Sequence, residues 1–228
     1  MQWQWRSRQG NSRDSNNDAV AIVIAEQYLF AMVVDAAEKV ESGTGLAQFW
    51  AMVNAEQLAK LVEPPSSDHV ISVMQKNHSE LRKQFLHGIA SYCALLLHLQ
   101  DRKAWVIHCG DCRLGSQQAG NVSWLSNIHT LANATGENFS QNDNANTDRH
   151  TLTRYLNARR FVLPDVQPVN CQTDHSWLLC SDGYWADHLG QNIPWGQLED
   201  DASCLEISEK MINTEFSSDC ENYLVYQG

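Results

Sequence analysis

The sequence has few basic residues and little proline. Its 228 residues include 16 Lys and Arg against 27 Asp and Glu, which gives a formal net charge of −11, and only 5 are proline. So acidic a chain lacks the broad basic surface that binding to nucleic acid or to an anionic membrane requires. We therefore expect neither a nucleic-acid partner nor a membrane partner.

Long hydrophobic runs are also absent. The richest apolar stretch, residues 92–99, is too short to span a bilayer, and residues 1–13 hold no apolar run long enough for a signal peptide. The 7 cysteines are odd in number, and several lie in apolar segments, where cysteine behaves as a small hydrophobic side chain. We expect a soluble, cytoplasmic protein with reduced thiols.

What the sequence does contain is the composition of a folded protein. Hydrophobic residues make up 43% of the chain, charged residues 19%, and 8 residues are tryptophan. No linker or internal repeat divides the chain, so we expect residues 1–228 to form a single domain. The asparagine-rich residues 136–149 are predicted to form a flexible surface loop.

Hydrophobic spacing predicts strands and helices in alternating pairs. Strands are predicted at residues 20–24, 28–34, 89–99, 104–109, 122–125, 161–169, 177–180 and 223–226. Helices are predicted at residues 46–62, 70–85, 152–159, 184–189 and 205–212. Because helices come in pairs between hairpins, the pattern favours a sheet-on-sheet core flanked by helices over a doubly wound parallel sheet.

Acidic residues recur at the ends of the predicted strands. Asp18, Asp35, Asp111 and Asp182 stand beside the ends of apolar runs, and Glu221 precedes the last one. A single Asp at a strand end is usually a turn residue. Several carboxylates that converge at one end of a sandwich repel one another unless cations lie between them, and ligands that are all oxygen suit Mg²⁺ or Mn²⁺.

Six segments, in this order, carry a resemblance to a known family. They are residues 10–18 (GNSRDSNND), 33–43 (VVDAAEKVESG), 108–114 (HCGDCRL), 152–156 (LTRYL), 178–185 (LLCSDGYW) and 221–226 (ENYLVY). The fifth nearly copies the LLCSDGLW motif of the metal-dependent protein phosphatases of the 2C, or PPM, type, and the third is similar to their NVGDSR segment. The chain resembles this family over residues 10–227.

The resemblance implies an α+β fold and a binuclear metal centre. The fold would be a four-layer αββα sandwich in which two antiparallel β-sheets are flanked by helices. Two Mn²⁺ or Mg²⁺ ions, with a weaker third, would lie in a cleft between the sheets, where a bridging water attacks phosphorus.

The resemblance also implies the residues of that centre. Asp35 would bridge the two metals, Asp182 and Glu221 would complete one site, and the carbonyl of Ala36 would contribute to the other. Arg13 would hold the phosphoryl oxygens through its forked guanidinium. Catalysis would then depend on Arg13, Asp35 and Asp182.

Further residues would support the centre or depart from the family pattern. Asp111, together with Asp182, would lie at the third metal, while Asp18, Asn17 and Asn222 would support the ligands. Asn17 stands where the family has Glu, and Ala186 stands where many members have another acidic ligand. Residues 38–39 (Glu-Lys) replace a Gly-Gly pair, and Ala36 replaces a Gly.

Two functions from different classes remain open. The first is hydrolysis of phosphoserine and phosphothreonine in proteins by a small bacterial-type phosphatase, acting as a monomer in signalling and opposing a Ser/Thr kinase. The second is a pseudophosphatase that binds a phosphoprotein or kinase without turnover. Retention of Arg13 and the metal carboxylates favours the first, and the neutral Asn17 with the altered loop at residues 38–39 favours the second.

Two other signals are weaker. Cys109 and Cys112 form a CxxC, but no second CxxC or suitably spaced His pair completes a zinc site, so we interpret both as packing residues. His108 and His129 are expected to be structural rather than catalytic.

Trp3 and Trp5 lie in a polar N-terminal stretch. They are predicted to pack as an edge strand, with a role as an anchor for a partner as the alternative.

Overall fold

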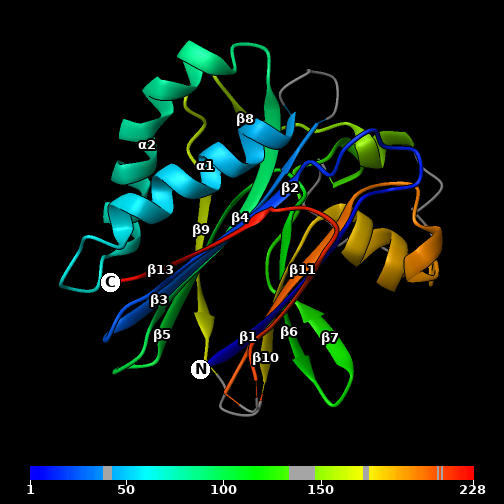
Figure 1. Ribbon diagram of the computed structural model, residues 1–228. Coiled ribbons are helices and arrows are strands. Elements are labelled where there is room, and N and C mark those ends of the chain that lie inside the picture. Colours follow the sequence, from blue (N-terminus) through cyan, green and yellow to red (C-terminus); the bar gives the residue numbers. More distant parts are fainter. Residues whose placement is uncertain (38–42, 134–146, 172–174, 210, 212) are drawn as a thin grey trace.

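Two β-sheets stack face to face, and helices cover their outer faces (Figure 1). The structure is a computed structural model that describes residues 1–37, 43–133, 147–171, 175–209, 211 and 213–228. The residues 38–42, which include Glu38, Lys39 and Glu41, and most of the predicted loop, residues 136–146, lie outside this description.

The elements follow one another along the chain with short connections. They are β1 Gln2–Arg8, β2 Asp18–Ile24, β3 Tyr28–Ala36, α1 Gly43–Leu58, α2 Ser67–Gln84, β4 Ile89–His98, β5 Lys103–Cys109, β6 Arg113–Gln118, β7 Asn121–Trp124, η1 Leu131–Asn133, η3 Thr147–His150, β8 Leu156–Asn157, β9 Asp165–Asn170, β10 Ser176–Cys180, η4 Gly183–Gly190, η5 Trp195–Gln197, β11 Ala202–Ser208, β12 Glu215–Ser218 and β13 Tyr223–Gln227. Here η denotes 3₁₀ helices, except that η4 is a π-helix.

Each sheet is mixed rather than purely antiparallel. One sheet has the strand order β12-β1-β11-β10-β6-β7, and the other has the order β13-β2-β3-β4-β5-β9 with β8 added beside β4. The pairs β1–β12 and β2–β13 are parallel, because the C-terminal strands run along the outer edges in the same direction as the strands they join. The expectation of two antiparallel sheets is therefore wrong for these edges, whereas the α+β sandwich is confirmed.

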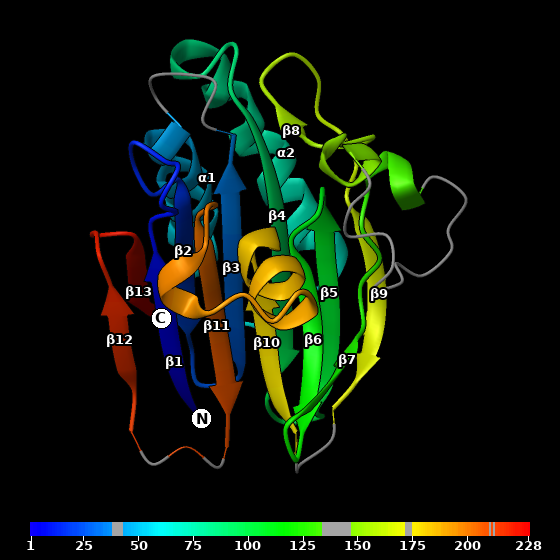
Figure 2. The ribbon, with the colours of Figure 1, turned by 90° about the vertical axis from the view of Figure 1, so that its right-hand side faces the viewer.

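Side-chain alternation along the strands creates separate apolar layers. On β2, Ala19, Ala21 and Val23 pack toward α1 and α2, whereas Val20 and Ile22 pack toward the other sheet. A third apolar cluster lies beneath η4, which crosses the outer face of β10 and β11 (Figure 2). One outer layer thus consists of two long helices and the other mainly of a short π-helix. Among the described residues, no helix is long and apolar enough to cross a bilayer.

Two helix predictions are wrong. Residues 152–159 contain the short strand β8, and Leu152 forms a β-bridge with Thr130. Residues 202–208 form β11, an interior strand that pairs with β1 on one side and β10 on the other. Both faces of β11 are largely buried, although residues 205–208 (LEIS) alternate between apolar and polar side chains as a strand does. In the predicted loop, residues 147–150 form η3.

The N-terminal strand is part of the core. The prediction that the Trp3 and Trp5 segment is a strand is confirmed, but β1 lies between β11 and β12 and is not an edge. Trp5 is fully buried between the sheets, and its indole nitrogen donates a hydrogen bond of 3.0 Å to Asn222 Oδ1. Trp5 therefore has a structural role.

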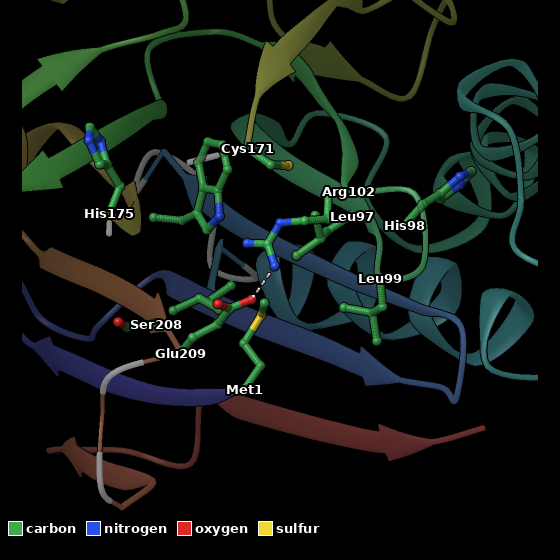
Figure 3. Close-up of a pocket in the computed structure, with 11 residues that line it drawn as sticks. Met1, Leu97, His98, Leu99, Arg102, Cys171, His175, Ser208 and Glu209 are labelled. Atoms are coloured by element: carbon green, nitrogen blue, oxygen red, sulfur yellow. Dashed lines mark hydrogen bonds and ion pairs between the residues drawn. The ribbon is translucent and has the colours of Figure 1, made fainter. Parts of the chain in front are cut away.

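A small pocket lies at the end of the sandwich where β4 ends and β10 begins (Figure 3). Leu97 and Trp177 line it, and Arg102 and Glu209 form an ion pair of 3.0 Å at its edge. Its volume of about 20 Å³ is enough for roughly one water molecule.

Replacing Trp5 with alanine should lower the free energy of unfolding by about 3–5 kcal/mol, because the change leaves a cavity between the sheets and removes the donor to Asn222. Urea unfolding followed by circular dichroism measures the loss. Phe216→Ala is the control, since that ring is 38% exposed on the neighbouring strand β12 and should cost far less. Equal losses would contradict a special role for β1 in the core.

Candidate active site

A cleft of about 690 Å³ opens at the opposite end of the sandwich, where β3 ends and β4 begins. The arrowhead of β3 marks this end at the top of Figure 2. The acidic residues that line the cleft are Asp35, Asp111, Asp182, Asp200 and Asp201. Each stands at a strand end or in the adjoining turn, so the stacking of the two sheets brings them together.

Burial and mutual repulsion raise the pKa values of these carboxyls. The pKa of Asp35 lies well above its ordinary value, first because of burial and then because of the charges of Asp18 and Asp182. Burial also raises the pKa of Asp182 well above normal, and the charges of Asp111 and Asp200 add to the effect. The pKa of Asp111 is raised chiefly by burial. At neutral pH these groups need protons or cations nearby.

The donor set fits a hard divalent cation. The converging groups are carboxylates, with the backbone of Ala36 at the cleft wall, and oxygen ligands are those preferred by Mg²⁺ and Mn²⁺. Beside them, Oδ1 of the buried Asp18 has no hydrogen-bond partner within the described part of the chain. Asp35, Asp111, Asp182 and Ala36 are thus brought together at the cleft, as the sequence predicts, although their metal-binding roles stay predictions.

The predicted supporting residues lie around this group. Asp18 is directly opposite Asp35 in the β2–β3 pair, and its Oδ2 accepts a hydrogen bond of 2.8 Å from Ser181 Oγ. Asn222 donates to the backbone oxygen of Asp18 at 3.0 Å, and Asn17 lines the cleft. These contacts link β2, β10 and β13 behind the carboxylates.

Glu221 does not take part in this group. Its side chain is exposed, and it is not among the described residues that line the cleft. The geometry of the described cleft therefore gives no support to the expectation that Glu221 completes a site with Asp182. A carboxylate that does line the cleft is Asp200, which immediately precedes Asp201 and the interior strand β11.

Asp200 and Asp201 are the site residues that sequence reasoning missed. Asp201 accepts hydrogen bonds from the backbone nitrogens of Gly10 at 2.9 Å and Asn17 at 2.8 Å, so it fixes the loop that carries Arg13. The signal is an acidic pair directly before a strand, the same pattern that indicates Asp18 at the start of β2. The spacing of apolar residues predicts a helix at residues 205–212, which hides the start of this strand.

Arg13 lies at the cleft in contact with Asp200. Its Nε and Nη2 both approach Asp200 Oδ1, at 2.7 and 2.6 Å. The side chains of Arg13 and Asp200 have relative exposures of 31% and 27%, so the guanidinium faces the cleft rather than the core. The structure therefore brings Arg13 to the carboxylates, as the sequence predicts.

The position expected to hold a further acidic ligand is neutral. Ala186 belongs to η4 and is buried. The neighbouring Asp187 forms an ion pair of 2.9 Å with Arg149, whose side chain is only 4% exposed. Asp187 is therefore engaged with a cation of the chain itself.

A second cluster, formed by His108, His129 and Asp165, has potential ligand atoms within 4.8 Å of one another. The backbone N–H of Gly110 donates to His129 Nδ1 at 3.0 Å, so this nitrogen is the acceptor of a neutral ring. His129 Nε2 must then carry the hydrogen, and it lies 3.1 Å from Asp165 Oδ2. Neither nitrogen has a lone pair left for a metal, and Arg154 pairs with the same carboxylate.

The CxxC residues are packing residues. Cys109 and Cys112 are buried free thiols, and burial raises the pKa of Cys109 to about 12. The pKa of Cys112 is raised well above normal by burial and by the charge of Asp35. Thiols held in the protonated form are poor metal ligands and poor nucleophiles.

The pKa of Asp18 predicts a pH dependence of stability. Burial, followed by the charge of Asp201, raises this pKa from 3.8 to about 8. The folded state therefore holds the Asp18 proton more tightly than the unfolded chain does. The stability that this provides is present below pH 3.8 and is lost as the pH rises through about 8.

Asp18→Asn has no carboxyl to titrate at this position, so this loss of stability with rising pH should disappear. In EDTA, the Tm of the variant minus that of the wild type should grow by several degrees between pH 4.5 and pH 8.5. Differential scanning calorimetry across this range measures the difference. A constant difference would contradict the raised pKa.

Comparison with known proteins places the fold. No family model and no curated protein matches the sequence. Among solved structures, the PPM Ser-Thr phosphatase MsPP from Mycobacterium smegmatis, in complex with cacodylate, is similar with a TM-score of 0.75 and 18% identity, over 91% of this chain and 98% of that chain.

Two further structures agree with this result. The serine/threonine phosphatase Stp1 from Staphylococcus aureus matches with a TM-score of 0.74 and 13% identity, over 92% of this chain and 96% of that one. The catalytic domain of PstP in complex with 2 manganese ions matches with a TM-score of 0.69 and 15% identity, over 91% and 97%. The chain has the fold of the PPM Ser/Thr phosphatases.

Proposed function

We propose that this protein is a metal-dependent phosphatase that hydrolyses phosphoserine and phosphothreonine in proteins. The observation that carries the proposal is the convergence of buried carboxylates with raised pKa values in one cleft that also presents Arg13. The similar structures, which include Ser/Thr phosphatases and one complex with 2 manganese ions, support this choice of reaction.

Each residue has a task in the proposed reaction. Asp35, Asp182 and Asp200 would hold two Mn²⁺ or Mg²⁺ ions, with the carbonyl of Ala36 as a further oxygen ligand. When bound, the cations supply an acidified water and neutralise charge on the phosphoryl oxygens. Arg13 binds the phosphoryl group, because its planar guanidinium presents several donors and stays charged at all relevant pH values.

A third cation is less well supported. Asp111 is available at the cleft, but Ala186 offers no side-chain ligand, and Asp187, which is paired with Arg149, is not among the described residues that line the cleft. We therefore propose two cations, with Asp111 as a further carboxylate that faces them across the cleft. The expected biological partner is a Ser/Thr kinase whose products this protein dephosphorylates.

Asn17 favours a second candidate function. This residue lines the cleft and is neutral, so one anion fewer faces the cations than in the family pattern. A pseudophosphatase that binds phosphoproteins without turnover is the alternative. Measurement of turnover separates the two.

Asp→Asn substitutions test the proposed ligands. Wild type should hydrolyse para-nitrophenyl phosphate and a phosphothreonine peptide only with Mn²⁺ or Mg²⁺. Asp182→Asn and Asp200→Asn should each lower kcat by about 100-fold or more, because a charged ligand is lost.

Glu221→Gln is the matched control for these variants. Like Asp200→Asn, it removes one carboxylate just before a strand, but Glu221 is not among the described residues that line the cleft. Its kcat should stay within about twofold of wild type. Wild-type activity no higher than that of Asp182→Asn would favour the pseudophosphatase. A loss in Glu221→Gln equal to that in Asp200→Asn would contradict the assignment of Asp200.

Arg13→Lys tests phosphoryl binding. Lysine keeps the charge but loses the forked geometry, so the inhibition constant of inorganic phosphate and the KM of the phosphopeptide should each rise about tenfold. Steady-state kinetics with phosphate as a competitive inhibitor measures both. Unchanged values would argue that Arg13 does not contact the phosphoryl group.

A further inference from the structure

The turn that presents Asp111 is held at several backbone atoms. Asp111 N donates to Ser91 Oγ at 3.2 Å, and Trp185 Nε1 donates to the Asp111 carbonyl at 2.8 Å. The preceding residue, Gly110, has a φ of 102°, and a Cβ there would overlap the Ser91 side chain. The turn therefore has one conformation, which only glycine fits at this residue.

His129 holds Gly110 from the other side, through two contacts. The Gly110 N–H donates to His129 Nδ1 at 3.0 Å, and the His129 N–H donates to the Gly110 carbonyl at 2.9 Å. The imidazole is about nine-tenths buried, with a relative exposure of 9%, so water competes little for the first contact. Both peptide groups that flank the Gly110 Cα are thereby fixed by one residue.

The ring of His129 is itself fixed in one orientation. With Nδ1 accepting from Gly110, Nε2 carries the hydrogen and donates to Asp165 Oδ2 at 3.1 Å, so the 3.3 Å approach of Arg154 Nη1 to Nε2 is a contact without a hydrogen bond. Arg154 pairs with Asp165 Oδ1 instead. On its face, the ring of His108 stacks at a centroid distance of 5.0 Å with an interplanar angle of 9°. Burial lowers the pKa of His108 to about 4, so His108 is neutral and does not repel the His129 ring at neutral pH.

A series of side-chain contacts connects the rim of the cleft with Asp111, the candidate metal ligand. Arg154 adjoins Tyr155, which lines the cleft, and the order of contacts is Arg154, Asp165, His129, Gly110 and then Asp111. A histidine that acts only as packing needs neither a fixed tautomer nor a bond to the turn.

We propose that His129 is a positioning residue that sets the orientation of Asp111 toward a bound cation, through the acceptor Nδ1 and the backbone of Gly110. This role rests on the proposed function, in which Asp111 faces the metal centre. Loss of a group that orients a metal ligand typically lowers metal affinity by about 10–100-fold.

Two amide substitutions separate the two ring nitrogens. The Oδ1 of asparagine can take the place of Nδ1 and accept from Gly110, whereas the longer glutamine places its amide near Nε2 and Asp165. His129→Asn should therefore bind Mn²⁺ within about threefold of wild type, and His129→Gln should bind it about 10–100-fold more weakly. Titration of the whole protein with Mn²⁺, followed by electron paramagnetic resonance of the free ion, gives these affinities without any measurement of activity.

Thermal melts of both variants show whether they are folded, and His129→Leu, which lacks both contacts, should resemble His129→Gln. If the leucine variant does not fold, the two amides still decide the question, because both keep a polar group at the buried position. Equal Mn²⁺ affinities for His129→Asn and His129→Gln would overturn the positioning role alone. A wild-type protein that binds no Mn²⁺ would overturn the proposed function and this role with it.

Discussion

Repulsion among carboxylates at one end of the sandwich is the constraint on which the cleft depends. Antiparallel pairing of β2 and β3 sets Asp18 opposite Asp35, and the facing sheet adds Asp182 at the end of β10. Water cannot screen these groups well, because burial is the main cause of each raised pKa. The Ser181 hydroxyl donates to Asp18 and the Arg13 guanidinium pairs with Asp200, so both contacts reduce this repulsion.

The acidic segment before β11 couples the parts of the cleft. Asp201 binds the backbone of the loop that carries Arg13, and Gly10 in that loop packs so closely against residues 199–200 that a Cβ would overlap their backbone. Asp200 contacts the Arg13 guanidinium directly. The group that would bind phosphate and a group that would bind a cation are therefore held in one rigid unit, so their separation is set by the fold.

How far the sequence predicts the site depends on how local the signal is. Asp111 and Asp182 lie in segments 108–114 and 178–185, whose neighbouring residues match family motifs, and both residues line the cleft. Asp200 is not predicted because residues 205–212 are interpreted as a helix, which hides the strand start beside Asp200, although residues 205–208 alternate as a strand does. Glu221 is predicted because residues 221–226 resemble the terminal strand motif of the family, and the next residue, Asn222, is indeed buried and bonded to Trp5 and to the backbone of Asp18.

The position of β1 also has a consequence for how the chain folds. This strand pairs with β11 and β12, so its partners are synthesised about 200 residues later. Such distant pairing gives a high contact order, which slows folding because a long loop must close first. During synthesis, β1 lacks its partner strands until β11 and β12 have been made, so the side chain of Trp5 stays exposed to solvent. In this interval the nascent chain is most prone to aggregation and most dependent on chaperones.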